Sequence, residues 1–581
     1  MKKLSALLMT LALVLGMLSA CGSAPAAQPE SVPAEEAAAP AEAAAPAEEA
    51  PAEDVPAAAE ASAAEEAASA EETLDGETPA EEHPTLDYPM VTDGSEAVTV
   101  WVSLPPHVAP YMEEVSQSAA YRQAAEATGI EMITTTVSVA VEQEQFQLMC
   151  ASGTTGDYDV IVGATFAYGS ADAALEDEIV MDVAPYIDEM MPDFAYFLKN
   201  DEEIRKVLTT DTGAIVNIAG RGPGGRPQGF GIRKDWLDKS GLEVPRTYDE
   251  LHDVLTVFKN DYACPEPLLM FSTGFLDNDF LCSGMGMTQA GYYIDGDTVR
   301  FAYLEDSFRE YATLVHQWYE EGLISPDFIS NVQGMGVSYD AKMQDGTLGV
   351  FMTGADIFSS ASKESASDPD WEVIPIADMT PTGTETITLG RTPNTNPLSN
   401  QWSVTTGPTE EHLPYVLGFI NWFFTDEGAL ACNFGIEGEG FEYDADGVPR
   451  LTELVTNNPE GYGSFVAEAV YLNWNAPFCQ DPRYYESVYD TQAQADTATV
   501  WNSNRNNSQQ YHGDLTGDEN TRYNAVYNDI YTYIANMSVS FMTGAQDIES
   551  QWDTFVSTIE SMGIDECISI KQDAYDRYLR R

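Results

Sequence analysis

Basic side chains are scarce in this sequence of 581 residues. Lysine and arginine together number 26, against 95 aspartates and glutamates, which gives a formal net charge of −69. This balance argues against nucleic-acid binding, because a phosphate backbone is bound by clustered Lys and Arg. It argues equally against electrostatic attachment to anionic lipid. The acidity instead favours solubility and tolerance of neutral or cationic ligands.

Motifs for catalysis and metal binding are also missing. The chain has six histidines and contains no G-x-S-x-G, no Walker loop and no H-E-x-x-H. A glycosidase pair stays open because carboxylates are abundant, but no pair stands out. Asp444-Ala445-Asp446-Gly447 and Asp295-Gly296-Asp297 suggest calcium, yet neither continues into a twelve-residue loop with a terminal Glu, which favours plain turns. We expect no catalytic residue, no cofactor and no metal site.

Cysteine is sparse and scattered. Apart from Cys21, the chain holds Cys150, Cys264, Cys282, Cys432, Cys479 and Cys567. Six cysteines allow about fifteen full pairings, and the sequence does not choose among them. A domain of this size does not need disulfides for stability, so buried free thiols and disulfides are both possible interpretations. No two of the six have the close spacing of a zinc site.

Long apolar runs are confined to the first segment, so no later membrane span is expected. Lys2 and Lys3 precede the apolar stretch Leu4 to Leu18, which is typical of a secretory signal over residues 1–20. The following Leu18-Ser19-Ala20-Cys21-Gly22 resembles a bacterial lipobox. That resemblance implies cleavage before Cys21 and lipid attachment to its sulfur. The alternative is an ordinary signal peptide with an incidental cysteine.

A tether follows the lipobox. From Gly22 to about Asp87 the sequence is mainly Ala, Glu and Pro and has no Lys or Arg. Self-repulsion and proline should keep this segment extended and unfolded, so we assign residues 21–94 to a lipidated cysteine and a disordered tether. The protein is then expected on the extracellular face of the cytoplasmic membrane, held by its lipid.

The remainder alternates short apolar runs with helical patterns, which indicates an α/β fold. Strands are expected over 97–102, 130–139 and 158–162, with helices over 121–128 and 144–151 between them. Thr247 and Glu250 form a capping box for a helix that continues to Phe258, and Ser307 and Glu310 are expected to repeat the device before a helix ending near Gly322. Apolar stripes predict further helices over 413–424 and 548–559.

Several segments carry a family resemblance. They are Phe146 to Gly153 with Tyr158 to Ile161, Ile232 to Leu242 with Pro245 to Leu251, Tyr319 to Phe328, Phe424 to Gly428 with Gly435 to Gly438, and Gln572 to Tyr578. In this order they resemble the extracellular solute-binding proteins of bacterial ABC importers, family 1. The most similar branch is the carbohydrate-type lipoproteins of Gram-positive bacteria. The matches span roughly residues 95 to 581.

The resemblance implies a two-lobe periplasmic-binding-protein-like fold with hinge-connected, discontinuous lobes. The chain would cross near Gly220 to Gly231, return near Leu389 to Gln401, and cross again around Asp444 to Glu453. Lobe 1 would be 95–222 plus 400–450, and lobe 2 would be 223–399 plus 451–581. The glycines of 220–225 fit G-x-G-x-x-G formally, but Pro223 and Pro227 leave no helix start for a dinucleotide, so a flexible crossing is expected.

Binding residues are predicted from the loops at strand ends, where the family places its ligand. Sugar sites combine flat aromatic rings with Asp and Asn side chains. We therefore expect ligand contacts from Phe166, Tyr168, Asp277, Asn278, Asp356, Trp402, Trp474 and Asn475. For each aromatic ring, core packing is the competing interpretation, and we assign Trp236 to packing because it opens a helix beside Leu237.

The resemblance implies a non-catalytic lipoprotein that captures an oligosaccharide and delivers it to the permease subunits of an ABC importer. We expect a monomer that binds no nucleic acid. One alternative is a peptide-binding transport lipoprotein, in which the same Asp side chains would accept an ammonium group. A secreted glycan-degrading enzyme is the other alternative, and an adhesin without a small ligand is a third class.

Overall fold

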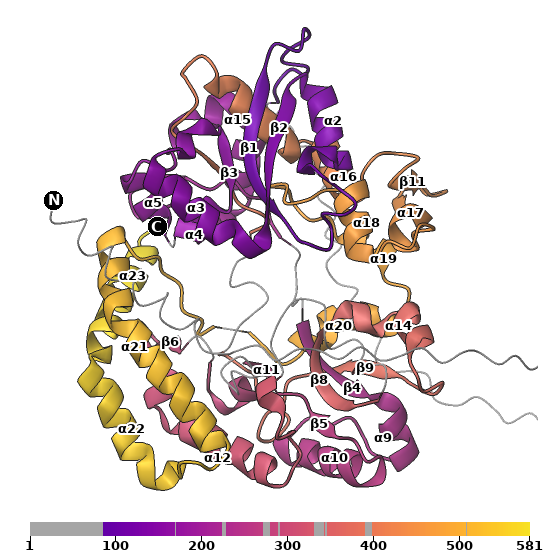
Figure 1. Ribbon diagram of the computed structural model, residues 1–581, viewed down its shortest axis with the longest axis vertical. Helices are drawn as coiled ribbons and strands as arrows, with labels where there is room; N and C mark the ends of the chain where they lie inside the picture. Colours follow the sequence, from indigo (N-terminus) through magenta and orange to yellow (C-terminus); the bar gives the residue numbers. More distant parts are fainter. Residues whose placement is uncertain are drawn as a thin grey trace, which may run out of the picture. The chain divides into compact units, whose positions relative to one another are not determined.

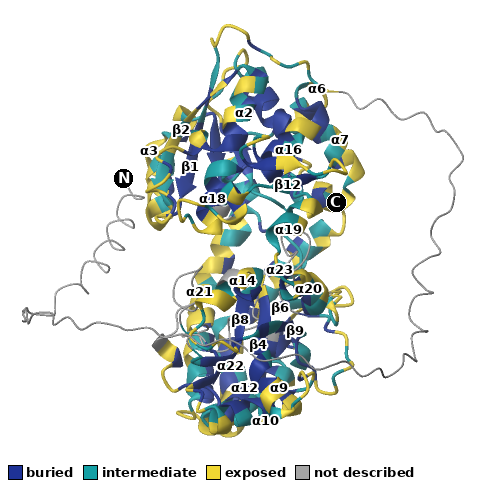
Figure 2. Cartoon of the chain, turned by 90° about the vertical axis from the view of Figure 1, so that its right-hand side faces the viewer, coloured by how far each residue is buried: buried dark blue, intermediate teal, exposed yellow. Residues whose placement is uncertain are grey.

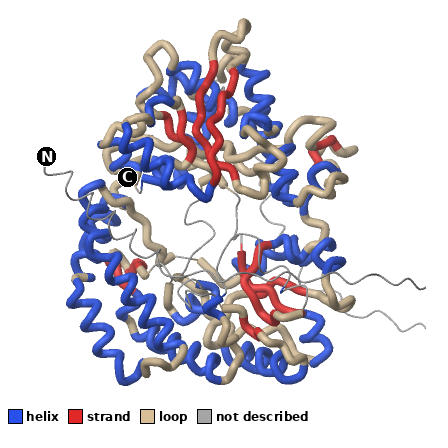
Figure 3. Tube along the Cα trace, viewed as in Figure 1, coloured by secondary structure: helices blue, strands red, loops and turns tan. Residues whose placement is uncertain are grey.

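The computed structural model describes residues 85–168, 170–222, 228–270, 279–288, 291–330, 342, 346–389, 398–506 and 508–581. These residues form two α/β lobes, each with a four-stranded sheet (Figures 1 and 3). The predicted lipidation site Cys21 and most of the predicted tether lie outside the described residues. Within them, no helix has the length and apolar character needed to cross a membrane.

The first lobe is built on β1 (Ala97–Leu104), β2 (Glu131–Ser138), β3 (Val160–Val162) and β10 (Trp402–Val404). The strand order is β10-β3-β1-β2, with β1 parallel to β2 and β3, and β10 antiparallel to β3. Strand alternation sends Val98, Val100 and Val102 into one core and Trp101 into the other. The three predicted strands of this lobe are confirmed, and a fourth comes from far along the chain.

Helices cover both faces of the first sheet. The larger core packs against α2 (Ala119–Thr128), α7 (Pro192–Asn200), α15 (Leu413–Asn421) and α16 (Asp426–Phe434). The smaller core receives Phe146 from α3 (Glu142–Ser152) and Ala174 from α5 (Ala171–Glu176). Figure 2 shows β1 buried among these helices, whereas the edge strand β2 is largely intermediate or exposed. Burial of both faces is what a largely parallel sheet requires.

The second lobe contains β4 (Gln228–Arg233), β5 (Glu266–Leu268), β8 (Leu348–Gly354) and β9 (Val373–Ile376) in the order β5-β8-β4-β9. One core packs against α9 (Lys234–Ser240), α10 (Tyr248–Asp261), α12 (Asp306–Glu320), α21 (Gly517–Met542), α22 (Ile548–Met562) and α23 (Ile564–Tyr578). Trp236 is buried in this core beside Phe258, as predicted. On the other face, Trp501 of α20 (Gln492–Asn502) packs with Phe358.

One of the two predicted capping devices is wrong. The Thr247–Glu250 capping box is present at α10, with both reciprocal hydrogen bonds. At α12 the N-cap is Glu305 and makes no side-chain cap. The Ser307 hydroxyl instead donates to the main-chain oxygen of Gly286 at 3.2 Å. The three-residue spacing alone does not fix a cap, because a neighbouring loop offers the hydroxyl a competing acceptor.

Residues 220–221, 399 and 478–480, which are far apart in sequence, lie side by side. Ser399 N donates to Gly220 O at 2.8 Å, and Gln480 N donates to Arg221 O at 2.8 Å. A Cβ on Gly220 would lie 2.3 Å from the main-chain carbon of Phe478, so glycine is required for this close approach. The expected crossings near 220–231 and 389–401 lie partly outside the described residues. The third is not at 444–453, because α19 (Pro482–Val488) still contacts β12 (Pro449–Leu451) of the first lobe, whereas Asp490 accepts a hydrogen bond from Ser360 N of the second lobe at 3.1 Å.

Three other expected boundaries also differ from the structure. Val466 and Phe478, assigned to lobe 2 by the sequence analysis, pack in the core of the first lobe. The tether ends before residue 94, because Tyr88 donates a hydrogen bond to Gly418 O at 2.8 Å and Val91 is buried. Residues 228–231 of the expected flexible crossing form part of β4, and a Cβ on Gly229 would meet the Trp501 ring at 2.4 Å.

The aspartates considered for calcium lie in β-hairpins, and the described cysteines form no disulfide. Asp444 accepts hydrogen bonds from Val448 N and Asp446 N in the hairpin of β11 (Phe441–Tyr443) and β12 (Pro449–Leu451). Asp295 and Asp297 flank the turn between β6 (Tyr292–Asp295) and β7 (Thr298–Phe301). All six described cysteines are free thiols, and four of them are buried.

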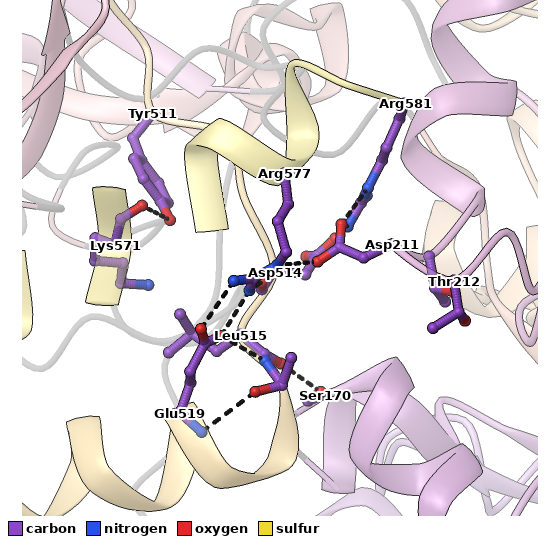
Figure 4. A network of polar contacts seen from close by, with 12 residues as sticks. Ser170, Asp211, Thr212, Tyr511, Asp514, Leu515, Glu519, Lys571, Arg577 and Arg581 are labelled. Carbon is purple, nitrogen blue, oxygen red and sulfur yellow. Dashed lines mark hydrogen bonds and ion pairs between the residues drawn. The ribbon is translucent and has the colours of Figure 1, made fainter. Parts of the chain in front are cut away.

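A polar network joins the C-terminal residues to the first lobe (Figure 4). Arg577 donates to Asp211, which follows α8 (Glu202–Leu208), and to Glu519 at 2.6 and 2.8 Å. Arg581 donates to the same Asp211 at 2.8 Å, and the Ser170 hydroxyl donates to Leu515 O at 2.8 Å. The hydrogen bonds that Arg577 donates to Glu519 hold the pKa of Arg577 above its usual value. The last helix is therefore tied electrostatically to the first lobe.

Candidate binding site

A pocket of about 500 Å³ lies where the parallel strands of the first lobe end. Ser103 near the end of β1, Gly163 after β3 and Glu142 at the start of α3 form one side. The crossing segments form the other side, and the remaining lining residues are Val162, Gly222, Leu398, Ser399, Asn400, Gln401, Asn475, Phe478 and Gln480. The carboxyl ends of parallel strands are where open α/β sheets place their ligands.

A second pocket of about 330 Å³ shares Asn400, Asn475, Phe478 and Gln480 with the first. Its other lining residues come from α16, from α18 (Ser464–Tyr471), from the loop after α18 and from α19 (Pro482–Val488): Cys432, Asn433, Phe465, Glu468, Ala469, Leu472, Asn473, Trp474, Tyr484 and Tyr485. The two pockets together form the site pocket. Its walls combine side-chain amides, two carboxyl groups and aromatic rings.

The loop from Asn473 to Asn475 is fixed by hydrogen bonds on both sides. The Trp474 indole N–H donates to Ser103 O at 2.8 Å, and the Trp402 indole N–H donates to Asn475 O at 2.6 Å. The Asn473 amide donates to Cys432 O at 2.7 Å. Asn475 adopts a left-handed backbone conformation with φ of +60°, which is uncommon outside glycine. This conformation turns the chain at the wall shared by both pockets.

Both carboxyl groups of the site pocket are shifted toward their neutral form. Burial raises the pKa of Glu142, against a hydrogen bond with Ser103 that lowers it. Burial raises the pKa of Glu468 to about 7, against a hydrogen bond with Tyr484 that lowers it. A protonated carboxyl can donate as well as accept, as an amide does. Among the described residues that line the site pocket there is no Lys or Arg.

Two predicted ligand contacts, Trp474 and Asn475, line the site pocket. Trp402 does not, because its ring is 0% exposed and packs between Tyr121 and Phe423. It acts instead through its hydrogen bond to Asn475. The Trp402 prediction is therefore wrong as a stacking residue: a ring closed off from solvent cannot meet a ligand.

The other predictions fall elsewhere or remain open. Tyr168 in α4 (Ala164–Tyr168) packs on Phe146 and donates to Asp177, and burial raises its pKa to about 12. Asp356 is exposed in the second lobe, outside the site pocket. The side chain of Phe166 and the residues Asp277 and Asn278 lie outside what the structure describes.

Sequence reasoning missed most of the polar lining. Glu468 sits in an apolar helical stripe, and Glu142 and Ser103 come from segments assigned to structure alone. Gln480 had a usable signal: the stretch 473–480 holds three amide side chains, Asn473, Asn475 and Gln480, around one Trp. Within the described part of the chain, no group of three or more His, Cys, Asp or Glu has the arrangement needed to hold a metal ion.

Two α/β lobes joined by adjacent crossings, with an amide-lined pocket at the strand ends, define the class of two-lobed solute-binding proteins. The chain belongs to the bacterial extracellular solute-binding protein family, whose family model matches residues 119–433. This confirms the family that the sequence motifs indicated. The carbohydrate-type branch accords with a relative from Streptococcus pneumoniae, described as the fructooligosaccharide ABC transporter substrate-binding protein FusA. It is 23% identical over 431 residues, which cover 69% of this chain and 76% of FusA.

Solved structures share the fold. The alginate-binding protein AlgQ2 without calcium ion is similar with a TM-score of 0.66 at 21% identity, covering 84% of this chain and 99% of that one. A solute-binding protein associated with an HMO-binding ABC transporter of Bifidobacterium longum infantis has a TM-score of 0.67 at 18% identity, with the same coverages. These similarities confirm the two-lobe periplasmic-binding-protein-like fold.

Proposed function

We propose that this protein captures a neutral oligosaccharide in the site pocket and delivers it to the permease subunits of an ABC importer. One observation carries the proposal: the described lining of the site pocket offers amides, carboxyl groups and aromatic rings, without Lys or Arg. Hydroxyl groups pair with amides and carboxyls, while aromatic faces cover the C–H surfaces of sugar rings. The fructooligosaccharide ligand of the relative FusA supports the same class of ligand.

The lining argues against an anionic glycan. A uronate polymer such as alginate carries one carboxylate on each sugar, and binding it would desolvate those charges beside Glu142 and Glu468. The net charge of −69 adds long-range repulsion. A cationic peptide is the rival ligand, because the same two carboxyl groups would accept its ammonium.

A calorimetric and thermal-shift panel tests the proposal. It contains neutral fructo-, malto-, xylo- and manno-oligosaccharides, uronate oligomers, and short cationic peptides. We expect at least one neutral sugar to raise the melting temperature, with nearly equal affinity at low and high salt. Stabilisation by cationic peptides alone, weakened by salt, would overturn the sugar assignment. Product release proportional to protein concentration would favour the glycan-degrading enzyme instead.

The proposed location is the extracellular face of the cytoplasmic membrane, with the lipid on Cys21 and the protein acting as a monomer. The lipobox-like residues 18–22 support the anchor. Replacing Cys21→Ala should release the protein into the medium of a Gram-positive host and abolish incorporation of labelled fatty acid. Retention of the label in the variant would contradict this anchor.

A further inference from the structure

Five aromatic side chains, at the site pocket and on the neighbouring surface of the first lobe, form two contacting groups. They are called here the aromatic strip and consist of Trp474, Phe465 and His107 in one group and Tyr462 and Tyr111 in the other. Trp474 and Phe465 both line the site pocket, and their rings meet edge to face with centroids 5.2 Å apart. The ring of Phe465 then lies 5.0 Å from that of His107, outside the pocket.

Two segments far apart in sequence supply the strip in matched pairs. His107 and Tyr111 come from the turn after β1, while Phe465 and Tyr462 come from the start of α18 and the loop before it. His107 pairs with Phe465, and Tyr111 pairs with Tyr462 at 4.7 Å. The tertiary fold, and no local pattern, therefore assembles this aromatic surface.

The strip remains open to solvent despite its apolar content. Phe465 is 41% exposed and Tyr111 is 51% exposed, and His107 is also exposed. Contiguous exposed apolar surface of this kind marks a binding surface more often than a structural one. Two partly buried members hold the strip in place: the Trp474 N–H donates to Ser103 O, and Tyr462 packs on the core of the lobe.

We propose that the aromatic strip holds further sugar units of an oligosaccharide whose end occupies the site pocket, so that the protein selects long chains over short ones. This inference rests on the proposed function. Continuity carries it, because Phe465 belongs to both the site pocket and the strip. The exposed carboxylates Glu113, Glu114 and Glu460 flank these segments and favour an uncharged chain here as well.

The test measures affinity along a length ladder of the panel sugar that binds. His107→Ala and Tyr111→Ala, both outside the site pocket, are compared with Tyr443→Ala, an equally exposed tyrosine of the same lobe whose ring meets Phe441 edge to face at 5.2 Å. We expect the strip variants to weaken binding of the long members about fivefold to tenfold and to leave the shortest members within about twofold. Tyr443→Ala should change neither.

A second variant distinguishes the loss of an aromatic face from a loss of stability. Tyr111→Leu keeps an apolar side chain but removes the flat face, so it should lose the same length dependence with an unchanged melting temperature. Equal losses for short and long chains, or no loss for either, would overturn the inference while leaving the proposed function intact. Unchanged sugar affinity with reduced transport would identify the strip as a permease contact and also overturn it. If the wild-type protein bound no oligosaccharide of any length series, both this inference and the proposed function would be overturned.

Discussion

The indole N–H of Trp474 donates a hydrogen bond to the main-chain oxygen of Ser103 at 2.8 Å, and this bond joins the loop after α18 to the carboxyl end of β1. Both residues line the site pocket, from segments more than 370 positions apart. The pocket therefore forms only when the loop that holds Trp474 has packed against the end of β1.

Replacing Trp474→Phe should remove this hydrogen bond and keep an aromatic ring. We expect a loss of about 1 kcal/mol in the free energy of unfolding, because Ser103 O loses its donor, and a severalfold loss of sugar affinity. The matched control is Trp501→Phe, since Trp501 also donates to a main-chain oxygen, that of Phe230 at 3.0 Å, but in the second lobe. Denaturant unfolding measures the loss of stability and calorimetry measures the sugar affinity. Equal losses of affinity in the two variants would contradict the prediction.

Replacing Asn475→Gly should separate its backbone role from its amide. The left-handed conformation at φ of +60° favours glycine, so the free energy of unfolding should stay equal or rise by up to about 1 kcal/mol. Sugar affinity should fall, because the amide at the shared pocket wall is lost. Glu178→Gly is the control: it relieves a similar φ of +56° outside the pocket and should leave calorimetric affinity unchanged.

Glu468 should make stability depend on pH between about 4.5 and about 7. Burial raises its pKa from 4.5 to about 7, so the folded state binds more protons than the unfolded state in this window. The free energy of unfolding should therefore fall as pH rises through the window, by about 3 kcal/mol, and stay low above it. Glu468→Gln should flatten this part of the curve, whereas Glu411→Gln, at an exposed position, should not. Parallel curves for wild type and Glu468→Gln would disprove the assignment.

Asp211→Ala should destabilise the protein by about 2 kcal/mol, because Arg577 and Arg581 both lose the acceptor that ties them to the first lobe. Their side chains are only 21% and 4% exposed, so water replaces the lost partner poorly. Asp238→Ala, which removes an exposed ion pair with Lys234, should cost less than about 0.5 kcal/mol. Thermal unfolding of the two variants checks this, and equal melting temperatures would refute it.

Local patterns predicted the elements but not their partners. The alternation of Val98, Val100 and Trp101 gives β1 its two buried faces, and the Thr247–Glu250 spacing gives α10 its cap, because both depend on residues a few positions apart. The third crossing could not be found this way. It follows α19, whose packing on β12 of the first lobe no periodicity records.

At the candidate site, too, the sequence predicts local features but not tertiary contacts. An aromatic residue in a loop is compatible with packing or with binding, and Trp402 and Trp474 have the same sequence signal. Tyr121 and Phe423 enclose Trp402, whereas Trp474 keeps one side on the pocket. The raised pKa of Glu468 could not be predicted from the sequence, because it arises from burial in the folded protein.

The sequence by itself determined the charge, the lipobox-like start, the α/β class and the family, since each is written in composition or in short motifs. The tertiary structure alone decided which amides, carboxyls and rings share one pocket, and which aromatic side chains extend it over the surface. The physical reason is that burial and pairing are set by contacts between segments hundreds of residues apart, so the environment of a side chain is a property of the folded chain.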